Sequence, residues 1–324
     1  MNEFSLIKRY FADASYVRKD VLVGIGDDAA VTKTPENQML ATTTDTLVQG
    51  VHFLPNSTPQ DIAHKAIAVN MSDLAAMGAE PSWISLSMSV PELDEEWLQG
   101  FSEKLKQLTE YYSIQLIGGD TVKGPLSITI TAQGFVPEQS ILTRSGAKNG
   151  DWLFVTGTLG DAGAGLDILK HDLNVEDYED KQFLINRHRR PSPRVIAGTV
   201  LRRLATSCID VSDGLLQDVM HIANTSDVGV IINLDKLPIS GALGRNVADL
   251  EQALTYACIS GDDYELLFTV PEEHRTTVQT ALDSYSVPYT CIGQMTGATG
   301  KLDLRLDEEP FEFKEPYAKG YQHF

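Results

Sequence analysis

The sequence predicts a two-domain α+β protein, because the chain is long, its first half alternates strand and helix patterns, and a polar segment divides it. A chain of 324 residues is long for one compact core and comfortable for two domains. The polar segment TRSGAKNGD (143–151) contains two glycines and marks a boundary near residue 148. We therefore predict an N-terminal sheet-and-helix domain over residues 1–148 and a C-terminal α+β domain over residues 149–324.

Two segments of the first domain have the alternating pattern of strands with one buried face. The segment WISLSMSV (83–90) places on one face Ile84, Leu86, Met88 and Val90. The segment LSITITAQGFV (126–136) repeats this alternation. Both segments are therefore expected to lie in one sheet.

Two helices are expected between these strands. For the first, over residues 58–78, Thr58 can cap the start, Pro59 suits the first position and Gly78 can end the helix. The second runs over about 94–112 and begins at the acidic stretch LDEEW. Strands at both ends with two helices between them predict a sheet that is covered on one side.

The second domain begins with the strand DWLFVTG (151–157), which leads through the glycine-rich turn TLGDAGAGL into a helix. Further helices are expected near 192–205, 214–225 and 272–284, and further strands near 228–234, 264–270 and 289–294. The basic segment RHRRPSPR (187–194) is expected to be a solvated lead-in to a helix.

An excess of acidic side chains excludes several classes of partner. Lys and Arg number 26 and Asp and Glu number 45, which gives a net charge of −19. Such a chain lacks the cations that neutralise nucleic acid or an anionic membrane. A phosphorylated ligand would need a local basic group or a divalent metal.

The cysteines and the apolar segments predict a cytoplasmic protein. Cys208, Cys258 and Cys291 are far apart and form no CxxC motif, so reduced thiols are expected rather than a disulfide framework or a zinc site. The N-terminus MNEFSLIKRYF lacks the apolar core of a signal peptide. No stretch of about 18 apolar residues is present to span a membrane.

Acidic residues recur beside glycine, serine, threonine or asparagine at predicted turns and strand ends. In GIGDDAAV (24–31) the adjacent carboxylates of Asp27 and Asp28 repel each other unless something neutralises them. The same pattern recurs at Asp45, Asp73, Asp120, Asp210, Asp213, Asp262, Asp263 and Glu265. Each motif alone is compatible with an ordinary turn. Together they predict a multi-metal nucleotide site, because Mg²⁺ is usually held by carboxylates, phosphates and water.

Asp73 is less easily explained as a turn residue, since NMSDLAAMG lies well inside the first predicted helix. Asn70 lies three residues earlier and shares its face of the helix. Both polar side chains need partners on a helix that is otherwise packed by apolar residues.

Other phosphate-binding and catalytic motifs are missing from the sequence. GAKNGD does not match the P-loop pattern GxxxxGK[ST]. Arg144 is a candidate phosphate contact, because a guanidinium presents a fork to phosphate oxygens. His52 is the one histidine close in sequence to a carboxylate motif, although a lone histidine is more often structural. Chemistry without a nucleophilic side chain fits phosphoryl transfer, where catalysis is mostly positioning and charge neutralisation.

Taken in order, these motifs resemble those of the thiamine-monophosphate kinase family, within the superfamily of aminoimidazole-ribonucleotide synthetase-like ATP-using proteins. The resemblance covers nearly the whole chain, through GIGDDAAV, TTTDTLVQGVHF, NMSDLAAMGAEP, LIGGDT, TRSGAKNGD, IDVSDGL, SGDDYEL and KGYQHF. It implies that ATP phosphorylates thiamine phosphate to thiamine diphosphate, with several Mg²⁺ ions. It also implies an N-terminal ATP- and Mg²⁺-binding domain that dimerises by joining sheets, and a C-terminal domain that closes over the site.

The resemblance also implies roles for individual residues. The implied metal ligands are Asp28, Thr44, Asp45, Asp73, Asp120, Asp210 and, in addition, Asp213. The implied ATP contacts are Gly119, Asp120, Arg144 and Ser212. The implied substrate contacts are His52, Tyr321 and either Asp262 or Asp263. An aromatic face such as that of Tyr321 could attract the cationic thiazolium ring.

Alternatives remain within the superfamily and outside it. Selenophosphate synthetases use a reactive residue near the N-terminus, whereas no cysteine precedes Cys208 here. The hydrogenase-maturation relatives end in a cysteine motif, whereas this chain ends in YQHF. Aminoimidazole-ribonucleotide synthetase itself shares the acidic motifs. A non-catalytic metal or nucleotide sensor would keep the carboxylates and form no product.

Overall fold

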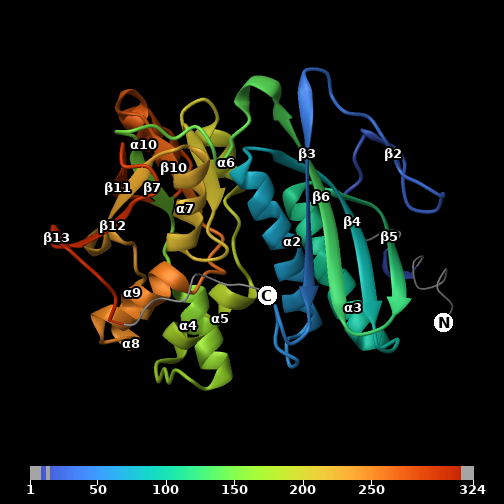
Figure 1. Cartoon of the computed structure of the whole chain (residues 1–324). Coiled ribbons are helices and arrows are strands. Elements are labelled where there is room, and N and C mark those ends of the chain that lie inside the picture. Colours follow the sequence, from blue (N-terminus) through green and yellow to red (C-terminus); the bar gives the residue numbers. More distant parts are fainter. Residues whose placement is uncertain (1–8, 12–14, 315–324) are drawn as a thin grey trace. The chain divides into compact units, whose positions relative to one another are not determined.

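The computed structural model describes residues 9–11 and 15–314, and the chain divides into two compact units (Figure 1). Unit 1 comprises Met1–Leu74 and Ala79–Glu138, and unit 2 comprises Ala75–Gly78 and Gln139–Phe324. Unit 1 thus ends before the polar segment in which the sequence placed the boundary. Among the described residues, we find no helix with the length and apolar character needed to cross a membrane.

Unit 1 is built on a four-stranded sheet in the order β3-β6-β4-β5. The strands are β3 (Gln38–Val48), β4 (Glu80–Val90), β5 (Gln115–Lys123) and β6 (Ser127–Pro137). Strand β6 is antiparallel to both β3 and β4, whereas β4 and β5 are parallel. The short strands β1 (Val21–Val23) and β2 (Val31–Thr32) form a separate pair. Helices α2 (Pro59–Ala76) and α3 (Glu95–Tyr112) cover one side of the larger sheet (Figure 1).

Both predicted helices of unit 1 are confirmed, and their ends follow local rules. The Thr58 hydroxyl accepts the Asp61 amide at 3.2 Å, and α2 begins at Pro59. Gly78 follows the helix with a φ of +66°, a value that glycine adopts without strain. At the start of α3, the Asp94 carboxylate accepts the amides of Glu96 and Trp97.

The alternation of the strands decides which side chains face the helices. The four residues expected on one face of β4 are all buried, as predicted: Ile84, Leu86, Met88 and Val90. On β3, Thr43 and Asp45 are half-buried beneath the helices, whereas Thr44 and Thr46 are exposed on the opposite face.

Unit 2 contains a seven-stranded sheet in the order β13-β12-β9-β11-β7-β10-β8. Its strands are β7 (Trp152–Thr156), β8 (Ser207–Asp210), β9 (Gly229–Asn233), β10 (Leu266–Val270), β11 (Tyr289–Thr296), β12 (Leu302–Leu306) and β13 (Glu309–Pro310). Neighbours are antiparallel except for β12 and β9.

Helices of unit 2 pack against both faces of this sheet. They are α4 (Asp161–Lys170), α5 (Tyr178–Arg189), α6 (Val195–Leu201), α7 (Leu215–Thr225), α8 (Gly241–Asn246), α9 (Leu250–Ile259) and α10 (Arg275–Ser284). Leu153 and Val155 of β7 pack in one core with α7 and α9. Phe154, between them, packs in another core with α6 and α10. Because both faces are covered, the central strands are continuously apolar.

The predicted helices near 214–225 and 272–284 are confirmed as α7 and α10. The helix expected near 192–205 is shorter, because Pro191 and Pro193 cannot donate backbone hydrogen bonds and α6 begins only at Val195. Helices α5, α8 and α9 and strand β12 were not predicted from the sequence.

Candidate active site

In unit 1, two predicted metal ligands form a carboxyl pair between β3 and α2. The carboxyl of Asp45 hydrogen-bonds that of Asp73, and the Thr43 hydroxyl donates to Asp73. Burial and the charge of Asp73 raise the pKa of Asp45 to about 7. Two carboxylates this close do not both ionise at low cost without a cation or a shared proton.

Next to this pair, Asn70 offers a further oxygen. Asn70 is fully buried one helical turn before Asp73, and its amide nitrogen donates to the Ala66 carbonyl at 3.0 Å. Its Oδ1 has no hydrogen-bond partner among the residues that the structure describes. A buried acceptor without a donor is costly, and together with the carboxyl pair it fits a hard divalent cation, which prefers oxygen ligands.

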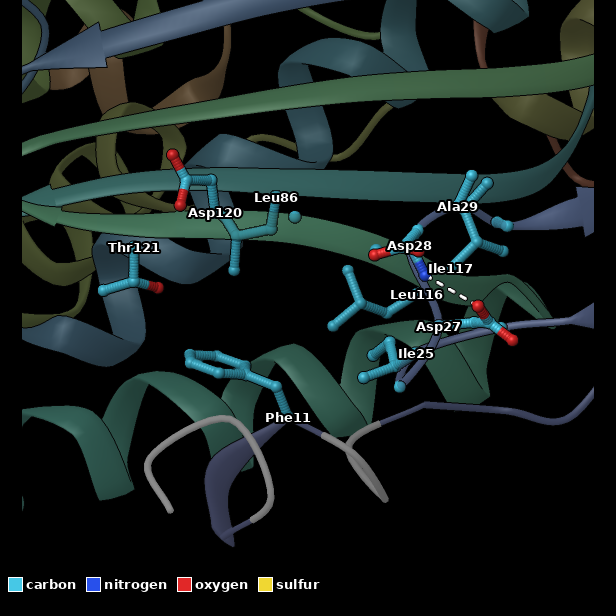
Figure 2. Close-up of a pocket in the computed structure, with 15 residues that line it drawn as sticks. Phe11, Ile25, Asp27, Asp28, Ala29, Leu86, Leu116, Ile117, Asp120 and Thr121 are labelled. Carbon is cyan, nitrogen blue, oxygen red and sulfur yellow. Dashed lines mark hydrogen bonds between the residues drawn. The ribbon is translucent and has the colours of Figure 1, made fainter. Parts of the chain in front are cut away.

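A second group of acidic residues lines a pocket of about 410 Å³ in unit 1. Asp27 and Asp28 lie at one end of this pocket and Asp120 and Thr121 at the other (Figure 2). Apolar side chains line the space between them: Phe11, Ile25, Leu86, Leu116 and Ile117. An elongated ligand with an apolar part and an anionic part suits such a pocket, provided that cations accompany the anion.

The backbone brings the pocket residues together through glycines. A Cβ on Gly119 would lie 1.9 Å from the Leu86 carbonyl oxygen, so only glycine lets β5 approach β4 this closely. Gly26 has a φ of +116°, and after it the Asp28 amide donates to the Asp27 carboxylate at 2.9 Å. Glycine at position 119, which was singled out from the sequence, is therefore required by the close approach of β5 to β4.

Unit 1 thus holds two acidic groups rather than one. Strand β3, which carries Asp45, is separated from β5, which carries Asp120, by two intervening strands. Three strand spacings correspond to about 14 Å. This separation calls for several ions or an extended ligand.

Two other predicted residues of β3 and its following turn have defined surroundings. The Thr44 hydroxyl lies on the exposed face, 2.9 Å from that of Thr131, so Thr43 and not Thr44 has its hydroxyl beside Asp73. Thr43 was not singled out from the sequence. His52 Nδ1 accepts the Val48 amide at 3.0 Å, which assigns the ring proton of a neutral His52 to Nε2.

In unit 2, Asp210 ends β8, and the loop that follows carries Ser212 and Asp213. Asp218, in the first turn of α7, accepts the amides of Ser212 at 3.1 Å and Asp213 at 3.2 Å. Burial and the charges of Asp210 and Asp213 raise the pKa of Asp218 to about 8. Candidate ligand atoms of Asp213, Asp218 and His221 lie within 4.8 Å of one another. Neither Asp218 nor His221 was selected from the sequence, although their spacing of three is a helical signal.

The structure distinguishes the two aspartates of SGDDYE. Asp263 is 2% exposed and accepts the amides of Gly160 at 2.8 Å and Ala162 at 3.4 Å, at the start of α4. Burial raises the pKa of Asp263 well above its usual value. The side chain of Asp262 is 27% exposed and lies 2.9 Å from His188 Nδ1. Asp263 is therefore engaged in capping a helix, whereas Asp262 reaches solvent.

The basic segment 187–194 is only partly solvated, in contrast to the prediction, because Arg187, His188 and Arg194 are drawn inward while Arg190 and Ser192 are exposed. Arg194 forms a two-pronged ion pair with the fully buried Glu265, with both distances at 2.6 Å, and Arg187 adds a third contact at 3.0 Å. Burial alone would raise the pKa of Glu265, but Arg194, Arg187 and the Thr156 hydroxyl lower it. A carboxylate buried in the sheet needs these partners, and this requirement draws the arginines inward.

Two predicted contacts remain without a structural partner or description. Arg144 is exposed in the loop after η1 (Glu138–Ser140), with no hydrogen bond to the part of the chain that the structure covers. Tyr321 and the KGYQHF motif lie outside the described residues.

Comparison with known proteins places both units in one family. Residues 26–136 match the N-terminal domain, and residues 148–305 the C-terminal domain, of the AIR synthase related proteins. The chain is 54% identical over 322 residues to the thiamine-monophosphate kinase of Escherichia coli (strain K12), covering 99% of this chain and 98% of that protein.

Solved structures give the same result. The crystal structure of thiamine-monophosphate kinase from Stenotrophomonas maltophilia K279a matches with a TM-score of 0.86 and 42% identity, covering 95% of this chain and 98% of that one. AaThiL complexed with AMPPCP and TMP matches with a TM-score of 0.77 and 34% identity, covering 93% of this chain and 92% of that one. This chain therefore belongs to the thiamine-monophosphate kinase family of AIR synthase related proteins.

Proposed function

We propose that the protein is a thiamine-phosphate kinase, which transfers the γ-phosphoryl group of ATP to the phosphate of thiamine phosphate. The product is thiamine diphosphate, and the reaction is the last step of its biosynthesis. One observation carries the proposal: the chain matches, along nearly its whole length, a relative that was solved with AMPPCP and TMP. AMPPCP has the shape of ATP, but a methylene group replaces the bridging oxygen whose bond to the γ-phosphorus breaks in the reaction.

In this reaction a phosphate oxygen of thiamine phosphate attacks the γ-phosphorus of ATP in line with the departing ADP oxygen. The new oxygen–phosphorus bond forms as the bond to ADP breaks, and no side chain need act as nucleophile. The protein's task is to hold two anions that repel each other. Metal ions bound with them would neutralise the phosphate charge.

We propose that several Mg²⁺ ions are held by the acidic residues of the two units. The proposed ligands are Asp28, Asp45, Asp73, Asp120, Asp210 and Asp213; Thr44 is left out, because its hydroxyl lies on the face of β3 that is turned away from Asp73. Asp45 and Asp73 support this assignment best, because burial and the charge of Asp73 raise the pKa of Asp45 to about 7, and a cation would relieve that repulsion. The hydroxyl of Thr43 is an additional candidate, since it already contacts Asp73.

For ATP, we propose Gly119, Asp120, Arg144 and Ser212 as contacts. The pocket of unit 1 offers apolar walls near Phe11 and Ile25 that suit a nucleotide base, with Gly119 and Asp120 at its edge. The exposed guanidinium of Arg144 can reach phosphate oxygens.

For thiamine phosphate, we propose His52, Asp262 and Tyr321. A neutral His52 carries its proton on Nε2, because Nδ1 accepts the Val48 amide, and an N–H donor of this kind suits an oxygen of the substrate. Asp262 is preferred over Asp263, since its carboxylate reaches solvent and can attract the thiazolium cation.

A direct assay tests the proposal. Incubation of the purified protein with ATP, Mg²⁺ and thiamine phosphate is expected to yield thiamine diphosphate and ADP in equal amounts. Chelation of divalent metal with EDTA is expected to stop the reaction, and excess Mg²⁺ to restore it. Nucleotide binding without product would instead identify a sensor, and an active enzyme in EDTA would reject metal assistance.

We also propose that the protein is a cytoplasmic homodimer that joins through its N-terminal sheets. The edge strand β3 of unit 1 exposes Met39 and Leu40, and the other edge strand, β5, exposes Val122. Open edges with apolar side chains favour pairing with another strand. Light scattering at working concentration is expected to give twice the chain mass, and a monomeric mass would contradict this proposal.

A further inference from the structure

The loop that connects β8 with α7 is hydrogen-bonded to one buried carboxylate, that of Asp218. Asp218 is 2% exposed, and its Oδ2 accepts both the Ser212 amide and the Asp213 amide. One oxygen that receives two successive backbone N–H groups fixes the orientation of both peptide planes. The side chains of Ser212 and Asp213 are therefore directed by a residue that lies outside their loop.

The turn itself has little freedom to compensate for a lost anchor. Gly214 has a φ of +117°, and a Cβ there would lie 2.7 Å from the Ile259 carbonyl oxygen. The start of α7 has no side-chain cap at Gly214. Asp218, in the first turn of α7, instead accepts the amides of the two residues that precede Gly214, and so ties the loop to the helix.

The other side of the same loop is bonded to the SGDDYE segment. The Asp262 amide donates to the Ser212 carbonyl, and the Tyr264 amide donates to the Val211 carbonyl, both at 2.8 Å. The two segments therefore form one backbone-bonded assembly in unit 2, with Asp218 as its anchor on the α7 side.

From this geometry we infer that Asp218 is a positioning residue for nucleotide binding, a role that rests on the proposed function. Its carboxylate orients the backbone that presents Ser212 and Asp213, and it is not itself a ligand. The reason is geometric: Oδ2 accepts two backbone N–H groups, so the orientation of the carboxylate is fixed by the loop that it holds.

Two substitutions of Asp218 separate positioning from direct ligation. Asp218→Asn keeps an oxygen that can accept the two amides, so its affinity for AMPPCP with Mg²⁺ is expected to stay within about threefold of the wild-type value. Asp218→Ala removes the acceptor, and its affinity is expected to fall by about tenfold or more, the size that corresponds to one or two lost hydrogen bonds. Calorimetric titration of AMPPCP measures both without any turnover.

Steady-state kinetics and a core variant supply the controls. In Asp218→Ala the KM for ATP is expected to rise more than the KM for thiamine phosphate. Val219→Ala, which trims a fully buried apolar neighbour on α7, is expected to lower the unfolding temperature and leave AMPPCP affinity unchanged.

Three results would overturn the inference. Wild-type affinity in folded Asp218→Ala would show that the amides need no anchor. A loss in Asp218→Asn as large as that in Asp218→Ala would make the charge itself essential and Asp218 a direct ligand. A tenfold loss in Val219→Ala would attribute the effect to general loosening of α7. If the wild-type protein bound AMPPCP but formed no thiamine diphosphate, the proposed function would fail while the role of Asp218 stayed testable.

Discussion

Replacement of Asp73 by asparagine is expected to lower kcat/KM for thiamine phosphate by about a thousandfold or more, with the fold intact. Asp73 supplies one carboxylate of the half-buried pair that the proposed Mg²⁺ would neutralise. Asparagine has the same shape and can still accept the Thr43 hydroxyl, but it lacks the charge that holds a divalent cation. A thousandfold loss corresponds to about 4 kcal/mol of transition-state stabilisation.

The measurement compares steady-state turnover with circular dichroism of the same preparation. Asp94→Asn is the matched control, because it makes the same chemical change in unit 1 at a helix N-cap, where asparagine serves as well as aspartate. This control is expected to keep wild-type turnover. If Asp73→Asn turned over normally, Asp73 would not belong to the active site.

Replacement of Asp45 by asparagine is expected to abolish most activity and yet to stabilise the metal-free protein at pH 8. The pKa of Asp45 is about 7 in the folded chain and 3.8 in the absence of these surroundings. Between these pH values the unfolded chain releases its proton while the folded chain retains it. Stability in the absence of metal therefore falls as the pH rises from about 4 to 7, and the loss is constant above that range.

Asparagine at position 45 removes this loss, so the variant and the wild type should differ most at pH 8 and progressively less toward pH 5. A pKa difference of about three units limits the stability that the variant gains at pH 8 to about 4 kcal/mol. For a domain of this size, each kcal/mol corresponds to about 2–4 °C in Tm.

Thermal unfolding in EDTA at several pH values tests this expectation. Addition of Mg²⁺ should raise the Tm of the wild type more than that of Asp45→Asn, because the cation relieves the repulsion that the variant lacks. A variant that is less stable than the wild type at pH 8 in EDTA would show that the carboxyl pair is not under electrostatic strain.

Local rules account for much of the fold that could be predicted from the sequence. Thr58, Pro59 and Gly78 mark the ends of α2 because capping and left-handed backbone depend on a few adjacent residues. The buried face of β4 follows from an alternation that is visible over eight residues. Asp73 could be selected from the sequence because a carboxyl group on an apolar helix face requires a polar partner in any tertiary arrangement.

Contacts between distant segments could not be predicted in the same way. The hydroxyl beside Asp73 belongs to Thr43 rather than Thr44, which depends on which face of β3 meets α2. Arg187 and Arg194 looked like solvent-exposed charges because their partner, Glu265, lies more than seventy residues away. The roles of Asp262 and Asp263 diverge because only the second reaches the amides at the start of α4.

From the sequence alone one could predict the two-domain α+β class, the ends of α2 and α3 and the residue types from which an acidic nucleotide site can be built. Periodicity, capping and the chemistry of carboxylates act over short stretches, so they can be read without coordinates. The long-range contacts were needed to show which carboxylates are paired, which one caps a helix and which one reaches solvent. Those choices depend on burial and on hydrogen bonds between residues that are far apart in the chain.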